Sequence, residues 1–323
     1  MRDLILAFPK QFPIGLLKAR DVRIGGPVSH VVISAMGGSA LAGEILLALR
    51  ASWGMGTPVT LSRSSTLPDG ISAATLLIAI SYSGNTEETL ASFEEAKARG
   101  LKIAAISSGG ELAKRAKAAN LPWIEIPEKH LPPRLAVGYM FASLVSVLIA
   151  ANALPDVSRE LEALASALEP ARWETPGREL AKKLEGKILL FYASPQYEGL
   201  ALIWKIKANE NAKTPAFQNV FSEINHNEIE GFSSPLGPFA AVILRDPDGE
   251  SPRMQKRITL TKELLDYHDV ETTIVDLAGK STLEKLFNAS LFADWTTLAL
   301  AEASGVDPMK TPLIEEFKKD LEK

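Results

Sequence analysis

Residues 75–86 read TLLIAISYSGNT, an uninterrupted apolar run followed at once by a turn rich in hydroxyl groups. A helical pattern over 87–99 begins directly after the turn. An apolar run that ends in this way predicts a buried parallel strand, a loop and a covering helix. The first N–H groups of a helix have no partner within it, and the helix dipole favours an anion there. The stretch therefore predicts a sugar-phosphate site formed by Ser81, Ser83 and Thr86.

The turn also has a plainer interpretation, in which Thr86 is only the N-cap of the helix and the serines are ordinary turn residues. A second segment of the same plan favours the phosphate site. Its strand, glycine turn and helix occupy 31–35, 36–39 and 40–53. Two such turns can offer hydroxyls and N–H groups to one ligand, which adds Gly38 and Ser39 to the candidate binding residues.

Strand-like and helical segments alternate through the first half of the chain. The expected strands lie at 28–35, 58–63, 75–80, 101–107 and 123–126. The expected helices lie at 40–53, 87–99, 111–119 and 135–153. This alternation predicts a parallel sheet covered by helices on both faces.

A second alternation follows a charged helical stretch that contains prolines and a glycine. Its strands are expected at 187–193, 239–245 and 272–277, and its helices at 199–213, 252–268 and 283–304. We expect an α/β fold with two doubly wound domains at 1–154 and 187–323, joined by a helical linker at 155–186. An amphipathic helix at 313–321 ends the second domain. Ligands of such sheets bind outside the carboxyl ends of the strands, where the strand order reverses.

The composition is that of a globular protein, with 323 residues of which 46% are hydrophobic. The formal net charge is −4, so neither nucleic acid nor an anionic membrane surface is an expected partner. The chain has no cysteine and no secretion-signal pattern, and we expect it to be cytoplasmic. Its four histidines are too scattered for a metal-binding pattern, and no metal or cofactor is expected.

Four motifs carry a resemblance to a known family. MGGSALAGE at 36–44 and SYSGNTEETL at 81–90 resemble the phosphosugar-binding motifs of the sugar isomerase (SIS) superfamily. ENAKTPA at 210–216 and EINHNEIEGF at 223–232 resemble the bifunctional phosphoglucose/phosphomannose isomerases more specifically. The resemblance implies two SIS domains of the flavodoxin-like αβα type, a hexose 6-phosphate substrate and a homodimer.

The residue types also suit aldose–ketose isomerisation. That reaction needs a carboxylate base, a group that opens the sugar ring and a cation beside the enediolate. Glu210 is the candidate base, although a single helix glutamate is more often only solvated. His226 lies in a segment without helical or strand period, where a catalytic or a structural imidazole can lie. The resemblance assigns ring opening to His226 and places it in the neighbouring subunit's site.

Two cations remain to be assigned. Arg134 follows two prolines, which restrict the backbone in front of it. A guanidinium held in a site and an ordinary surface arginine both fit this position. The resemblance places it beside the enediolate oxygen. Lys318 looks like a solvated helix lysine from the sequence alone, whereas the resemblance makes it the family's C-terminal lysine, with Lys310 as the alternative. The resemblance also implies that the Thr311 hydroxyl lies near the substrate.

These observations favour a cofactor-independent isomerase that interconverts glucose 6-phosphate, fructose 6-phosphate and mannose 6-phosphate. The phosphate-site motifs alone also fit an SIS isomerase of another phosphosugar, a non-catalytic phosphosugar sensor or the isomerase part of an amino-sugar enzyme. A sensor would be expected to carry a DNA-reading or partner domain, and an aminotransferase a glutaminase domain. We recognise neither in this sequence.

Overall fold

The computed structural model describes residues 1–128, 130–235 and 237–321. The chain folds as two compact units. The N-terminal unit comprises Ala7–Leu168 and Thr282–Glu284. The C-terminal unit comprises Met1–Leu6, Glu169–Ser281 and Lys285–Lys323. In the described residues, no helix has both the length and the apolar character that crossing a membrane requires.

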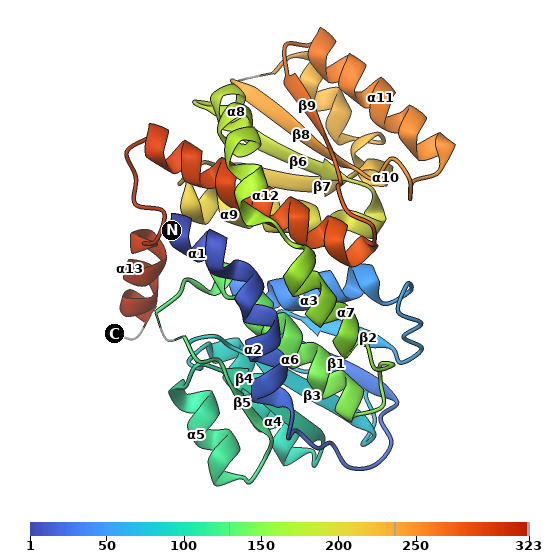
Figure 1. Ribbon diagram of the computed structural model, residues 1–323, viewed down its shortest axis with the longest axis vertical. Coiled ribbons are helices and arrows are strands. Elements are labelled where there is room, and N and C mark those ends of the chain that lie inside the picture. Colours follow the sequence, from blue (N-terminus) through green and yellow to red (C-terminus); the bar gives the residue numbers. More distant parts are fainter. Residues whose placement is uncertain (129, 236, 322–323) are drawn as a thin grey trace. The chain divides into compact units, whose positions relative to one another are not determined.

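The N-terminal unit contains a sheet of parallel strands in the order β2-β1-β3-β4-β5 (Figure 1). The strands are β1 (His30–Ala35), β2 (Val59–Ser62), β3 (Thr75–Ile80), β4 (Lys102–Ser107) and β5 (Trp123–Glu125). The helices are η1 (Phe8–Lys10), α2 (Gln11–Ala19), α3 (Gly37–Leu49), α4 (Glu87–Ala98), α5 (Gly110–Ala118), η2 (Pro133–Leu135), α6 (Val137–Ala150) and α7 (Ser158–Ala167). The strand order reverses between β1 and β3, so a ligand is expected at the carboxyl ends of these two strands.

Helices cover both faces of this sheet, as the alternation of segments predicts. Val32 and Leu77 pack on one face with Phe93 of α4 and Leu112 of α5. Helices α3 and α6 pack against each other, and α2 packs against α6. The inner strand β3 is buried along its whole length, which explains its continuous apolar sequence.

The C-terminal unit contains a smaller parallel sheet in the order β7-β6-β8-β9. The strands are β6 (Ile188–Ala193), β7 (Ala216–Val220), β8 (Phe239–Arg245) and β9 (Glu271–Asp276). The helices are α1 (Arg2–Ala7), η3 (Pro170–Trp173), α8 (Glu174–Leu184), η4 (Pro195–Tyr197), α9 (Glu198–Asn211), α10 (Phe221–Ile224), η5 (Glu228–Ser233), α11 (Pro252–Tyr267), α12 (Thr282–Ala303) and α13 (Pro312–Leu321). The last residue of α1 and the first three residues of α12 belong to the N-terminal unit. The predicted α/β class with two parallel sheets is confirmed.

Two local differences from the expected elements bear on the site. Helix α3 begins at Gly37 rather than at residue 40, so Gly38 and Ser39 lie in its first turn. Strand β7 was not expected, because its sequence AFQNV carries polar residues where a buried strand would be apolar. It lies at the edge of its sheet, and only its first residue, Ala216, is buried, so polar side chains are tolerated there.

Candidate functional site

The turn between β3 and α4, residues 81–86, carries a cluster of hydroxyl groups and is called the hydroxyl turn below. Ser81 Oγ lies 2.8 Å from Thr86 Oγ1 and accepts a hydrogen bond from the N–H of Gly84 at 3.1 Å. Ser81 is buried and Ser83 is exposed. Thr86 occupies the N-cap position of α4, yet its side chain makes no capping hydrogen bond to the described residues of that helix. The start of α4 therefore keeps N–H groups that an anion can use.

Glycines at two positions allow this turn to form. Gly84 has φ +74°, and a Cβ there would lie 2.0 Å from the carbonyl oxygen of Gly109. A Cβ on Gly110 would lie 2.3 Å from the carbonyl oxygen of Ser83. Any other residue at either position would force the two backbones apart. The turn is thus packed directly against the segment that begins α5.

The turn after β1 joins the first one. The N–H of Tyr82 donates to Ser39 Oγ at 3.0 Å. A Cβ on Gly38 would lie 2.7 Å from the backbone nitrogen of Arg134 and 3.0 Å from Pro133. Because Gly38 has no side chain, the first turn of α3 can lie against the segment that carries Arg134. The predicted residues of the N-terminal unit are therefore neighbours in space.

Arg134 lies in η2 and is only 2% exposed. The Tyr82 hydroxyl accepts a hydrogen bond from the N–H of Leu131 at 3.0 Å and donates one to the carbonyl of Glu128. It therefore fixes the segment that precedes Arg134. On the other side, Gln11 Nε2 donates to the carbonyl of Leu135 at 2.7 Å. Burial raises the pKa of Tyr82, which therefore keeps its proton as a donor at neutral pH. The Arg134 backbone is fixed on both sides.

Glu210 is the last residue but one of α9, and that helix is anchored by buried polar contacts. Lys207 Nζ donates to Asp294 Oδ2 of α12 at 2.7 Å, and the two side chains are only 1% and 3% exposed. Asn211 Nδ2 donates to Thr297 Oγ1 of α12 at 2.9 Å. These contacts stand one helical turn before Glu210 and directly after it, so they fix the end of α9 that carries the carboxylate.

His226 follows α10, and its side chain is exposed. The loop around it is held at two points. Asn225 Nδ2 donates to Thr261 Oγ1 of α11 at 2.8 Å. The Glu228 carboxylate accepts hydrogen bonds from the Tyr192 hydroxyl at 2.5 Å and from Asn219 Nδ2 at 2.6 Å. Burial, and after it the bond to Glu228, raise the pKa of Tyr192, so its hydroxyl stays protonated.

From its sequence neighbours alone, Glu228 fits an ordinary surface charge. Its partners lie on β6 and β7, and one of these strands was not expected. No local pattern in the sequence could have identified the contact.

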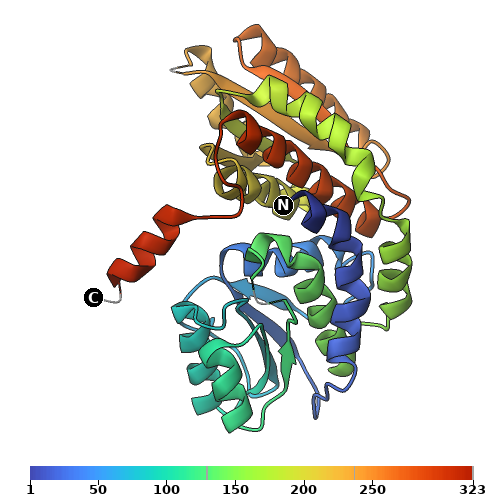
Figure 2. The ribbon, with the colours of Figure 1, turned by 60° about the vertical axis from the view of Figure 1, so that its left-hand side comes forward.

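Thr311 and Lys318 lie in the C-terminal tail. Thr311 precedes α13, and its carbonyl accepts the N–H of Glu315 at 3.0 Å. Figure 2 shows α13, at the end marked C, standing apart from the other elements of its unit, and none of its residues is buried. The Lys318 side chain is exposed on this helix. Lys310, the alternative lysine, lies in the turn just before it, 3.7 Å from Asp307 Oδ2.

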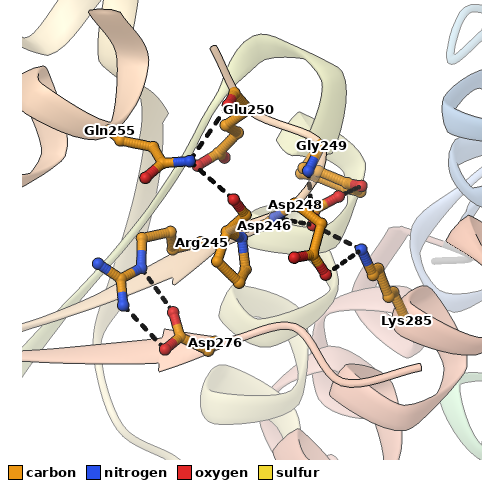
Figure 3. Close-up of polar contacts among 10 residues, drawn as sticks. Arg245, Asp246, Asp248, Gly249, Glu250, Gln255, Asp276 and Lys285 are labelled. Atoms are coloured by element: carbon orange, nitrogen blue, oxygen red, sulfur yellow. Dashed lines mark hydrogen bonds and ion pairs between the residues drawn. The ribbon is translucent and has the colours of Figure 1, made fainter. Parts of the chain in front are cut away.

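The C-terminal unit has a counterpart of the hydroxyl turn, at residues 246–251 between β8 and α11. Figure 3 shows that this counterpart turn is lined by carboxylates. The buried Asp246 accepts Lys285 Nζ at 2.7 Å and the Tyr197 hydroxyl at 2.5 Å. Ser251 caps α11 through a hydrogen bond from the N–H of Met254. A phosphate at this turn would meet like charge and a helix start that is already capped.

Comparison with known proteins places the chain in a family. Residues 27–150 match the model of the SIS domain, and residues 174–321 match that of the bacterial phospho-glucose isomerase C-terminal SIS domain. A bifunctional phosphoglucose/phosphomannose isomerase of Caldicellulosiruptor bescii is 36% identical over 94% of this chain and 91% of its own. One from Aquifex aeolicus is 32% identical over 92% of each chain. The chain belongs to the bifunctional phosphoglucose/phosphomannose isomerase family.

A solved structure shows the same fold beyond this family. The C-terminal domain of glucosamine-fructose-6-phosphate aminotransferase from Francisella tularensis superposes with a TM-score of 0.75 at 12% identity, covering 95% of this chain and 97% of that one. Within the bifunctional isomerase fold, the ten predicted residues fall into two sets. The N-terminal unit holds Gly38, Ser39, Ser81, Ser83, Thr86 and Arg134, and the C-terminal unit holds Glu210, His226, Thr311 and Lys318.

Proposed function

We propose that the chain is an aldose–ketose isomerase that interconverts glucose 6-phosphate with fructose 6-phosphate, and mannose 6-phosphate with fructose 6-phosphate. The observation that carries the proposal is the hydroxyl turn of α4, tied through Tyr82 to the segment that carries Arg134. A helix start that can bind an anion, joined to the segment that carries the buried Arg134, suits a phosphosugar whose reaction develops negative charge. The relatives that match nearly the whole chain carry this activity in their names.

Each residue set has a distinct role in the proposed reaction. Ser39, Ser81, Ser83 and Thr86 hold the phosphate, with Gly38 allowing the backbone to approach. His226 and Lys318 move the protons that open the sugar ring, and Thr311 contacts the substrate. Glu210 takes the proton from C2 of the aldose and returns it to C1, while Arg134 stabilises the cis-enediolate between these steps. Rotation about C2–C3 presents either face of the enediolate to Glu210, which accounts for both hexose epimers.

The proposal includes a homodimer in which His226 serves the site of the neighbouring copy. The exposed His226 side chain in a loop held at Asn225 and Glu228 supports it, because an imidazole offered to a partner must be both accessible and fixed. We place the activity in the cytoplasm, which agrees with a chain that has no cysteine.

The substitution Glu210→Gln tests the function, since it removes the base and keeps the shape of the side chain. We expect turnover of both substrates to fall by about 10³-fold or more, with phosphosugar binding largely unchanged. Glu198→Gln, which alters an exposed glutamate in the first turn of the same helix, is the matched control and should keep full activity. Coupled assays with each hexose 6-phosphate, run in the presence of chelator, measure this. Turnover of Glu210→Gln within tenfold of the parent would remove the base assignment.

Mixing two inactive variants tests the shared site. Glu210→Gln and His226→Ala protomers, exchanged in one tube, should regain part of the parental activity because some dimers contain one intact site. Absence of recovery after confirmed subunit exchange would mean that each chain builds its site alone. Phosphosugar binding by calorimetry without turnover in the parent would instead support a sensor.

A further inference from the structure

Lys213 makes a set of contacts that joins the end of α9 to the C-terminal tail. Its ammonium donates to the carbonyl oxygens of Glu210 at 2.7 Å, Asp307 at 2.6 Å and Lys310 at 2.7 Å. A fourth carbonyl, that of Asn211, lies at 3.4 Å. The three short bonds match the three hydrogens of an ammonium group, and each is charge-assisted.

The backbone at Lys213 is shaped for this contact. Lys213 has φ +54°, a left-handed conformation that non-glycine residues seldom adopt, and it follows the C-cap residue Ala212 of α9. This conformation turns the chain back at the helix end and brings the side chain to the last carbonyls of α9. A cation at this position also interacts favourably with the helix dipole. Glycine would be the residue expected if only the turn mattered.

The other end of the contact is a short turn that begins the tail. Asp307 Oδ1 accepts the N–H of Met309 at 2.8 Å, which closes the turn on itself. Thr311 follows Lys310 directly, and α13 with Lys318 begins at the next residue. No side chain of α13 is buried. The contacts of Lys213 with the 307–310 turn therefore set where the tail leaves the body of the unit.

We infer that Lys213 is a positioning residue that ties the tail to the helix end bearing Glu210. This inference rests on the proposed function, because only there do Glu210, Thr311 and Lys318 act on one substrate. The same ammonium bonds the Glu210 carbonyl and the carbonyl just before Thr311, so the two segments share one anchor. Loss of that anchor leaves the chemical groups intact and changes the range of positions that the tail can sample.

Lys213→Met removes the donors and keeps both the length of the side chain and the demand on the backbone. We expect kcat to fall about tenfold while KM changes less than twofold, because the substitution leaves the proposed phosphate-binding groups of the turn between β3 and α4 unchanged. Hydrogen exchange of the amides at 309–315 should become at least fivefold faster. Lys205→Met, at another lysine of α9, is the control and should alter neither quantity.

A double substitution separates positioning from a merely structural role. If Lys213 acts through the tail, Lys213→Met should lower kcat little further when Lys318→Met is already present. Additive losses, or unchanged exchange at 309–315, would overturn the inference. If Lys213→Met does not fold, Lys213→Arg replaces it in the same comparison, with about a threefold loss of kcat expected. Should Glu210→Gln keep its activity, the proposed function fails, whereas the exchange measurement still decides the contact.

Discussion

The hydroxyl turn and its counterpart turn occupy the same place in two sheets of like topology and have opposite chemistry. Strands β3 and β8 each lie beside the first strand of their sheet, and each is followed by a turn and a covering helix. The β3 turn offers hydroxyls at a helix start without a side-chain cap from the described residues. The β8 turn offers carboxylates and a helix start capped by Ser251. Topology therefore determines where a ligand can bind, and the side chains decide whether an anion binds.

A carboxylate introduced into the hydroxyl turn should have the largest effect on this contrast. Ser83→Asp brings negative charge to an exposed position beside the start of α4, so binding of glucose 6-phosphate should weaken by about 100-fold or more. The matched change in the counterpart turn is Asp248→Ser, at a side chain that is 84% exposed. It should leave phosphosugar binding unaltered. Calorimetry measures both, and parental affinity in Ser83→Asp would show that the turn has a structural role and does not bind the phosphate.

The helix starts provide a second, smaller contrast. Thr86→Ala removes a ligand hydroxyl, so the Michaelis constant for both hexose 6-phosphates should rise by about 5- to 30-fold, the equivalent of about 1–2 kcal/mol. The unfolding free energy should change less than on loss of a cap, because Thr86 makes no cap to the described residues of α4 and the variant loses only the contact with Ser81. Ser251→Ala should do the reverse and cost about 1 kcal/mol of unfolding free energy without altering the Michaelis constant. Steady-state kinetics and thermal unfolding of the two variants measure this. Equal effects of both variants on stability would remove the distinction.

The sequence predicts those elements whose pattern of apolar and polar residues is local. Strand β3 and its turn follow from a continuous apolar run and a hydroxyl-rich segment, and the structure places both within a residue of the expected bounds. Strand β7 could not be predicted, since an edge strand with polar residues lacks that pattern. The same holds for Tyr82, which reads as one more turn residue. Its hydroxyl holds residues 128 and 131, and only the fold brings these segments together.

The site residues divide in the same way. Hydroxyls and glycines near a helix start can be recognised in a sequence because all the groups that bind the anion lie within one short segment. Glu228 depends on partners 9 and 36 positions away, and Lys213 reaches two carbonyls of the tail 94 and 97 positions away. Nothing in their neighbours along the chain distinguishes them from surface charges. Residues that position reactive groups through distant contacts therefore cannot be predicted from the sequence alone.

The counterpart turn contains a contrast of its own, between two carboxyl groups four residues apart. Burial works against ionisation of Asp246, but bonds from Lys285, Tyr197 and the N–H of Gly249 outweigh it, so the pKa of Asp246 lies below its ordinary 3.8. Burial is also the largest influence on Glu250, and the Ser194 hydroxyl and the Asp246 N–H do not offset it, so the pKa of Glu250 lies above its ordinary 4.5. The ionised form of Asp246 stabilises the fold, whereas that of Glu250 opposes it.

Glu250→Gln should accordingly raise stability at neutral pH, by about 1–2 °C in Tm. The folded parent binds this proton more tightly than the unfolded chain, so its stability falls as pH rises from 4.5 through the higher folded-state pKa and stays reduced above it. The advantage of the variant should therefore be present at pH 7 and vanish below pH 4.5. Asp246→Asn should lower Tm at pH 7, and its deficit should shrink as pH falls below 3.8. Thermal unfolding of the three proteins from pH 3.5 to 7.5 measures this, and a Glu250→Gln variant less stable than the parent at pH 7 would show that the turn needs both negative charges.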